Sequence, residues 1–311
     1  MSLPEEKLIA RFLAPFAGFS RDVTIGPGSD CAAVKVARGQ QLVSTTDALV
    51  NGVHFDWRWF SEAQVGHKAL AVNLSDLAAA GAVPRWFLCA LGIPPGEEAR
   101  AGGIARGMAR LAQPHGCALI GGNISAARDW SITITALGEA AKPRSRSGAK
   151  PGDALVICGE LGNAAAGLRL LRSTRRPALN RDISRALKAQ RSPWPLVDEG
   201  LRARGLATAA IDVSDGFVKD LGRLCVASGV GAEVDCDALP VARAATVDEA
   251  LSGGEDYALL FSVPQKKLEA LHAITGCKPV GRFTRQPGVR LIEDGKPREL
   301  PRSTGFDHLN G

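Results

Sequence analysis

The chain has 311 residues, 45% of them hydrophobic and 23% charged, which is typical of a globular protein long enough for two domains. Its formal net charge is +6, and many of its basic residues gather in residues 142–150 and 169–191. Aromatic residues make up only 5% of the chain. A solvated basic face or attraction of an anionic phosphorylated ligand explains this pattern better than nucleic acid does. No apolar run reaches the roughly 18 residues of a membrane span, so no membrane partner is predicted.

Short apolar strands alternate with helices along the first half of the chain. Residues 1–18 form an amphipathic pattern that predicts a docking helix rather than a signal peptide. The pattern next predicts strands over 41–45 and 131–137, helices over 62–80 and 97–113, and a short strand over 118–120 that leads into a glycine pair.

A change of composition marks the predicted domain boundary. Around residues 140–151 the pattern breaks into Lys, Pro, Arg, Ser and Gly, and a strand and helix follow within 154–173. We therefore predict an N-terminal domain over 1–140 and a C-terminal domain over 141–311.

The seven cysteines are odd in number and scattered, and none forms a Cys-x-x-Cys pair. This spacing predicts reduced core thiols in a reducing compartment, hence a cytoplasmic protein with neither a disulfide framework nor a zinc site. The cysteines are Cys31, Cys89, Cys117, Cys158, Cys225, Cys236 and Cys277.

Residues 73–84 combine an apolar helical run with one carboxylate, Asp76, and a Gly-to-Pro stop. A carboxylate on an apolar helix is costly to bury unless it is paired, hydrogen-bonded or bound to metal. Taken alone, Asp76 is better explained as a solvated or capping residue.

Further carboxylates stand beside small residues, glycines or hydroxyls in both halves of the chain. Each one alone fits a helix cap or a turn, but together they favour a shared site. Carboxylate, hydroxyl, water and phosphate oxygens are the ligands of Mg²⁺. These carboxylates are Asp30, Asp47, Asp212, Asp215, Glu255 and Asp256.

The common phosphate-binding motifs are absent, since the chain has no Gly-x-x-x-x-Gly-Lys-Ser/Thr and Gly26-x-Gly28 lacks a third glycine. Gly121-Gly122-Asn123 fits either a phosphate cradle or a tight turn. Arg146 fits either a phosphate partner or a solvated linker. The chain also lacks a Gly-x-Ser-x-Gly elbow, and its histidines are dispersed, so no covalent catalytic residue is predicted.

The ordered set of motifs resembles the thiamine-monophosphate kinase family of the aminoimidazole-ribonucleotide synthetase-like superfamily, from about residue 5 to residue 308. The matching segments are Gly-x-Gly-x-Asp30-Cys-Ala, Ser-Thr-Thr-Asp47-x-Leu-Val-x-Gly-Val-His54-Phe, Lys68-Ala-Leu-Ala-Val-Asn-Leu-Ser-Asp76-Leu-Ala-Ala-x-Gly-Ala, Arg146-Ser-Gly-Ala-Lys-Pro-Gly-Asp, Ile-Asp212-Val-Ser-Asp215-Gly, Ser-Gly-Gly-Glu255-Asp-Tyr and a terminal Gly-Phe306-Asp-His.

The resemblance implies a two-domain α/β and α+β fold, in which the sheet of an N-terminal α/β domain pairs across a homodimer beside a C-terminal α+β domain. It implies a Mg²⁺-dependent kinase that transfers the ATP γ-phosphoryl group directly to thiamine monophosphate, giving thiamine diphosphate and ADP. Such a transfer depends on positioning and charge neutralisation rather than on a covalent intermediate.

The resemblance also assigns roles to individual residues by position. It places several Mg²⁺ ions on Asp30, Thr45, Thr46, Asp47, Asp76, Asn123, Asp212 and Asp215. It places the ATP phosphates on Gly121, Gly122, Asn123, Arg146 and Ser214. It places thiamine phosphate on His54, Glu255 and Phe306, with Glu255 as counter-charge to the thiazolium ring.

Two positions depart from the family pattern. Ser29 stands where the family usually has a first aspartate, and Asn123-Ile124 replaces the usual Asp-Thr. An Asn keeps an oxygen ligand but removes one negative charge, so we expect a higher Mg²⁺ requirement. The alternatives are a superfamily member acting on another small anionic substrate, and a nucleotide-binding protein that has lost catalysis.

Overall fold

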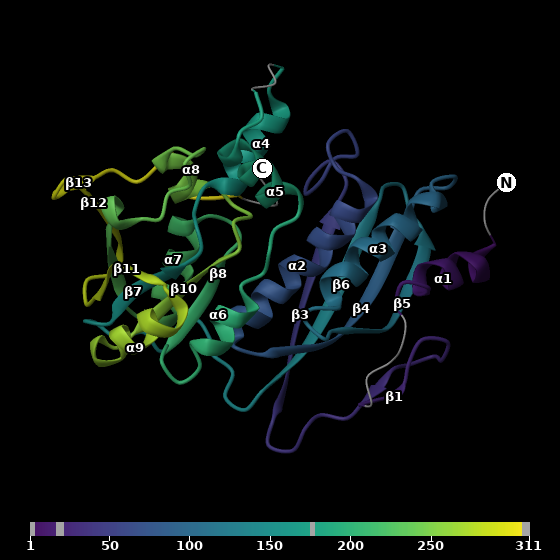
Figure 1. Cartoon of the computed structure of the whole chain (residues 1–311). Coiled ribbons are helices and arrows are strands. Elements are labelled where there is room, and N and C mark those ends of the chain that lie inside the picture. Colours follow the sequence, from purple (N-terminus) through teal and green to yellow (C-terminus); the bar gives the residue numbers. More distant parts are fainter. Residues whose placement is uncertain (1–3, 17–21, 175–177, 307–311) are drawn as a thin grey trace. The chain divides into compact units, whose positions relative to one another are not determined.

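The computed structural model describes residues 4–16, 22–174 and 178–306. The chain forms two compact units (Figure 1). The first comprises Met1–Leu77 and Ala82–Lys142, and the second comprises Ala78–Gly81 and Pro143–Gly311. Along the described residues, no helix is both long enough and apolar enough to span a bilayer.

The first unit is built on a four-stranded sheet with the order β3-β6-β4-β5 (Figure 1). Neighbours are antiparallel except β4 and β5, which run parallel. Its strands are β3 (Gln41–Val50), β4 (Val83–Ile93), β5 (Ala118–Ala126) and β6 (Ser131–Ala140), and β1 (Val23–Ile25) pairs separately with β2 (Ala33–Val34). Its helical segments are α1 (Glu5–Leu13), α2 (Glu62–Ala80), η1 (Glu98–Arg100) and α3 (Ala101–Ala112).

Glycines allow α2 and α3 to pack with their backbones almost in contact. A Cβ atom on Gly66 would lie 1.9 Å from the Ile104 carbonyl oxygen, and one on Gly107 would lie 1.9 Å from that of Ala63. Only glycine fits either position.

The four-stranded sheet has one covered and one open face. On β6, Ile132, Ile134 and Ala136 are fully buried, whereas the alternating Thr133 and Thr135 are only half-buried. Because side chains alternate along a strand, one face holds the core of the unit and the other remains accessible.

The second unit contains a seven-stranded sheet of order β13-β12-β9-β11-β7-β10-β8, antiparallel except for the β9–β12 pair. Its strands are β7 (Ala154–Cys158), β8 (Ala209–Val213), β9 (Gly231–Asp235), β10 (Ala258–Val263), β11 (Lys278–Thr284), β12 (Gly288–Glu293) and β13 (Lys296–Arg298). Its helical segments are α4 (Asn163–Arg172), α5 (Arg181–Arg191), α6 (Val197–Arg202), α7 (Phe217–Ser228), η2 (Cys236–Ala238), α8 (Val247–Ser252) and α9 (Gln265–Thr275).

Helix α7 supplies much of the second core. Its side chains Phe217, Leu221 and Leu224 are fully buried in one cluster with Ile211 of β8 and Leu291 of β12. The first turn of α7 is thereby fixed directly after the end of β8.

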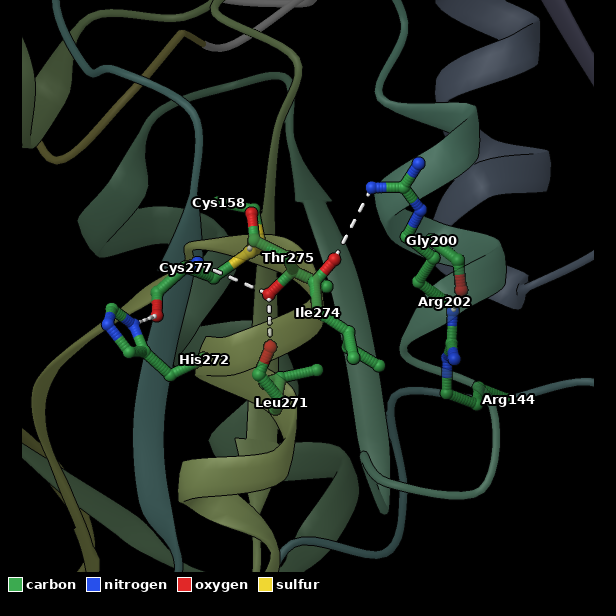
Figure 2. The surroundings of a disulfide bond; sticks show 9 residues. All are labelled: Arg144, Cys158, Gly200, Arg202, Leu271, His272, Ile274, Thr275 and Cys277. Carbon is green, nitrogen blue, oxygen red and sulfur yellow. Dashed lines mark hydrogen bonds between the residues drawn. A yellow bond between two sulfur atoms is a disulfide. The ribbon is translucent and has the colours of Figure 1, made fainter.

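One cysteine pair corrects the prediction of reduced thiols. Cys158 at the end of β7 and Cys277 before β11 form a disulfide, with Cα atoms 4.6 Å apart (Figure 2). Strands β7 and β11 are antiparallel neighbours, which brings together two cysteines 119 residues apart in sequence. Figure 2 also shows the Thr275 hydroxyl, which accepts from the Cys277 N–H at 3.2 Å and donates to the Leu271 carbonyl oxygen at 2.7 Å.

Several elements differ from the predicted ranges. The predicted helix over 97–113 begins as a 3-10 turn, so α3 starts only at Ala101. The strand predicted to stop at residue 120 continues through Gly121 and Gly122 as β5, because these glycines pair with β4 as edge-strand residues. Helix α2 spans its predicted range of 62–80.

Candidate functional site

Three of the predicted metal ligands in the first unit lie close together. The Thr45 hydroxyl on β3 donates to Oδ2 of Asp76 on α2 at 2.5 Å. Asp47 lies two residues farther along β3 and therefore shares the face of Thr45. The next residue, Thr46, points to the opposite face, where its hydroxyl donates to the Ile134 carbonyl oxygen at 3.0 Å.

The donor set of this group fits a hard cation. Asp47 and Asp76 supply carboxylates and Thr45 a hydroxyl, and Mg²⁺ commonly takes one or two carboxylates and fills its shell with water and substrate phosphates. Within residues 4–16, 22–174 and 178–306, no three or more His, Cys, Asp or Glu side chains gather as a possible metal site. Carboxylate and hydroxyl donors of this kind leave room in the Mg²⁺ shell for water and phosphate oxygens.

The predicted phosphate cradle lies on the edge strand β5. A Cβ atom on Gly122 would lie 1.9 Å from the Cys89 carbonyl oxygen, so the close approach of β4 requires glycine. Gly122 stands in one row of the sheet with Asp47, three strand spacings away. That separation is about 14 Å. Asn123 lies on the open face, and the structure does not bring it to Asp76 within one chain.

An apolar pocket of about 270 Å³ adjoins these glycines. It is enclosed by α1, by the loop after β1, and by β4 and β5. Its lining consists of Ile9, Phe12, Leu13, Pro27, Gly28, Ser29, Cys89, Leu91, Leu119, Gly121, Gly122, Asn123 and Ile124. Asp30 follows this lining in an exposed position between β1 and β2.

Hydrogen bonds from backbone and side chain hold His54 in the first unit. Its Nδ1 accepts from the Val50 N–H at 3.1 Å, and its carbonyl oxygen accepts from Nζ of Lys68 at 2.9 Å. Lys68 is fully buried on α2, with its ammonium group 5.3 Å from the centre of the Phe60 ring. This buried cation anchors the turn that carries His54.

In the second unit, Asp212 lies near the end of β8, and Ser214 and Asp215 lie in the turn between β8 and α7. The two aspartates are buried, at 4% and 8% exposure. Oδ2 of Asp215 lies 2.6 Å from Nη2 of Arg223 and 3.4 Å from Nζ of Lys219. These two cations offset the charge of the Asp215 carboxylate.

Phe306 joins the same turn through its backbone. Its N–H donates to the Asp215 carbonyl oxygen at 2.9 Å, and its carbonyl oxygen accepts from Nζ of Lys219. The Phe306 side chain stays 41% exposed.

Arg146 is also exposed in this unit, and its carbonyl oxygen accepts from the Ser228 hydroxyl at 2.9 Å.

Glu255 occupies a strained backbone position. Its φ is 70° and that of Tyr257 is 50°, both in the left-handed region that non-glycine residues rarely adopt. The Glu255 N–H donates to the Ser214 carbonyl oxygen at 2.7 Å, and Gln190 Nε2 donates to Glu255 Oε2 at 2.7 Å. Such strain persists where the surroundings impose it, often at functional sites.

Asp256, next to Glu255, is turned inward to the start of α4. Its carboxylate accepts from the Gly162 N–H at 2.5 Å and from the Ala164 N–H at 2.9 Å. Burial raises the pKa of Asp256 to about 7, although the two backbone donors oppose the rise.

The sequence matches the AIR synthase related protein family in both units, with the N-terminal domain over residues 28–140 and the C-terminal domain over 150–294. Thiamine-monophosphate kinase of Salmonella typhimurium is 37% identical over 325 aligned residues that cover 99% of each chain. The enzyme of Escherichia coli K12 is likewise 37% identical with the same coverage. The chain belongs to the thiamine-monophosphate kinase family.

Solved structures of the thiamine-monophosphate kinase family superpose on the whole chain. The enzyme of Stenotrophomonas maltophilia has a TM-score of 0.82 and 36% identity, covering 96% of this chain and 99% of its own. The AaThiL complex with AMPPCP and TMP has a TM-score of 0.78 and 30% identity, covering 99% of each chain. The predicted two-domain fold is confirmed.

Sequence reasoning assigned no role to Gln190, which holds Glu255, nor to Lys68, which holds His54 and begins the matching segment that contains Asp76. A lone cation within the apolar run of α2 was the available signal for Lys68. Gln190 gave no signal, since it lies on a highly charged helix 65 residues before Glu255.

Proposed function

We infer that this chain transfers the γ-phosphoryl group of ATP to the phosphate of thiamine monophosphate, giving thiamine diphosphate and ADP. The observation that carries this inference is its 37% identity to thiamine-monophosphate kinases over 99% of both chains. A 30% identical relative of the same fold binds AMPPCP and TMP. The residues that the family resemblance assigned to ATP, metal and substrate remain proposals for this chain.

We propose that the carboxylates of both units hold Mg²⁺, with Thr45, Thr46 and Asn123 as neutral oxygen ligands. Bound Mg²⁺ supplies positive charge to the phosphate oxygens. Asp76 keeps its carboxylate beside Thr45 through their 2.5 Å hydrogen bond, which fixes the direction of its remaining lone pairs. The carboxylates of this set are Asp30, Asp47, Asp76, Asp212 and Asp215.

The ATP site that we propose uses the edge strand β5. The 270 Å³ apolar pocket beside Gly121 and Gly122 suits a purine base, because it is largely lined by aliphatic and aromatic side chains. The absence of side chains at the two glycines lets phosphates approach the backbone. Arg146 and Ser214 are further proposed phosphate contacts.

The thiamine phosphate site that we propose consists of His54, Glu255 and Phe306. Glu255 supplies the counter-charge for the thiazolium ring, with one oxygen oriented by Gln190. The Phe306 side chain is 41% exposed, and we propose that its ring stacks on an aromatic ring of the substrate. The acceptor phosphate is ionised near neutral pH, so the transfer needs positioning more than a general base.

We also propose that the chain works as a homodimer joined through the open face of its four-stranded sheet. That face carries mostly small and hydroxyl side chains, and Leu42 on it is 49% exposed. Asn123 lies on this face in the same row as Ala48, three strand spacings or about 14 Å away. Sedimentation equilibrium of the full chain and of Ala48→Arg tests the dimer, since the arginine should yield monomers.

Product formation tests the activity. The purified chain with ATP, Mg²⁺ and thiamine monophosphate should release ADP and thiamine diphosphate in equal amounts. Asp76→Asn, which keeps the size of the side chain, should abolish both products while leaving the fold intact. ATP turnover only with another acceptor would indicate a different substrate, and ATP binding without turnover would indicate lost catalysis.

A further inference from the structure

The turn between β8 and α7 is closed around a buried carboxylate that the family resemblance did not assign. Three successive backbone N–H groups, those of Ser214, Asp215 and Gly216, all donate to Oδ2 of Asp220 at 3.0, 2.9 and 3.2 Å. Asp220 lies in the first turn of α7, and its side chain is fully buried.

Converging N–H groups at the start of a helix usually form an anion site, because their dipoles all point at one spot. Here the chain's own carboxylate occupies that spot. The three N–H groups are therefore already paired, so they are unavailable to a substrate phosphate. Their pairing instead fixes the backbone from Ser214 to Gly216.

The second oxygen of Asp220 extends this arrangement to the side chain of Asp215. Oδ1 of Asp220 accepts from Nη1 of Arg223 at 2.6 Å, and Nη2 of the same guanidinium lies 2.6 Å from Oδ2 of Asp215. One arginine thus bridges the two carboxylates. Charge-assisted contacts of this kind are short and directional, so they orient both partners.

We propose that Asp220 is a positioning residue for the kinase: it sets the Ser214–Gly216 turn directly and the Asp215 carboxylate through Arg223. This inference rests on the proposed function, which assigns Asp215 to Mg²⁺ and Ser214 to ATP. Without the Asp220 charge, Arg223 is left to Asp215 alone and competes with the metal for that carboxylate. The backbone of the turn also loses its shared acceptor.

Asp220→Asn is the informative variant, because it keeps the volume of the side chain and removes only its charge and one acceptor oxygen. Asp237→Asn is its matched control, since Asp237 lies in the same unit and accepts the Asp294 N–H at 2.9 Å. Two quantities are measured on the full chain. One is Mn²⁺ binding in the presence of AMPPCP, followed by electron paramagnetic resonance, and the other is hydrogen exchange of the amides of residues 214–216 without metal.

In Asp220→Asn, we expect the Mn²⁺ dissociation constant to rise about 10-fold, as for other outer-sphere partners of metal ligands. Exchange at residues 214–216 should be faster, while exchange in the last turns of α7 and in Asp237→Asn stays as in the unaltered chain. A purely structural role would lower the melting temperature without changing Mn²⁺ affinity in the folded protein.

The inference is overturned if folded Asp220→Asn binds Mn²⁺ as tightly as the unaltered chain, with unchanged exchange of the turn. If the variant fails to fold, the unaltered chain still tests whether Asp220 holds the turn. In that chain, the amides of residues 214–216 should exchange slowly. Exchange as fast as in an open loop would refute the proposal. If the unaltered chain binds no Mn²⁺, the metal assignment of Asp215 is wrong as well. This result distinguishes a failure of the proposed metal site from a failure of the role proposed for Asp220.

Discussion

The buried carboxylate of Asp256 should make the stability of the protein depend on pH. Both of its oxygens accept backbone N–H groups at the start of α4. Burial is the largest cause that raises its pKa from the ordinary 3.8 to about 7, the hydrogen bonds from Ala164 and Gly162 oppose the rise, and the nearby Glu255 charge adds to it. The folded protein therefore holds a proton here that the unfolded chain releases near pH 4.

The direction of the effect follows from linkage. Where the folded state binds more protons than the unfolded state, the free energy of unfolding falls as pH rises. The contribution of Asp256 is fully present below about pH 4 and is lost by the time the pH has passed about 7. The difference in pKa corresponds to about 4 kcal/mol in all, of which about 2–3 kcal/mol is lost between about pH 5 and pH 8.

Urea unfolding of the unaltered chain and of Asp256→Asn at several pH values between about 5 and 8 measures this term. The amide does not titrate, so the fall of about 2–3 kcal/mol should be missing from the variant. Because an amide nitrogen cannot accept an N–H, the variant should also be less stable by about 1–3 kcal/mol at the acidic end. Parallel curves for the two proteins, with a constant difference in the free energy of unfolding, would refute this explanation.

Three further substitutions test the site. Gly122→Ala should destabilise the protein by about 1–3 kcal/mol in urea and weaken AMPPCP binding, because its Cβ would meet the Cys89 carbonyl oxygen at 1.9 Å; unchanged values would contradict the close approach. Asn123→Asp should lower the Mg²⁺ concentration for half-maximal activity by roughly 5- to 10-fold, since a contacting charge is worth about 1 kcal/mol even in water. An identical Mg²⁺ dependence would remove Asn123 from the metal site. Gln190→Leu should raise the KM for thiamine monophosphate about 10-fold with little change in kcat, because Glu255 loses a donor to a charged oxygen. A change in kcat alone would contradict this.

The parts of the fold that were predictable are those with a strong local pattern. Helix α2 follows an apolar run that ends at Gly81 and Pro84, and it spans its predicted residues. Strand β6 alternates buried aliphatic with half-buried hydroxyl side chains, so a strand could be predicted there. The strand extends to Ala140, beyond the predicted range of 131–137. Local pattern failed at Gly121 and Gly122, where pairing with β4 outweighs the usual preference of glycine for turns.

Contacts between distant segments could not be derived from local pattern. The Cys158–Cys277 disulfide depends on the pairing of β7 with β11, which no spacing in the sequence reveals. The cytoplasmic location stays a prediction. The candidate ligands Thr45 and Thr46 are adjacent in sequence, but strand alternation sends only the first hydroxyl to Asp76.

Transfer of a labelled phosphoryl group tests the central claim most directly. With γ-³²P-labelled ATP and unlabelled thiamine monophosphate, the label should appear in the terminal phosphate of thiamine diphosphate, in amounts equal to the ADP formed and without a labelled protein intermediate. Label released only as inorganic phosphate, or retained on the protein, would contradict direct transfer to the substrate phosphate.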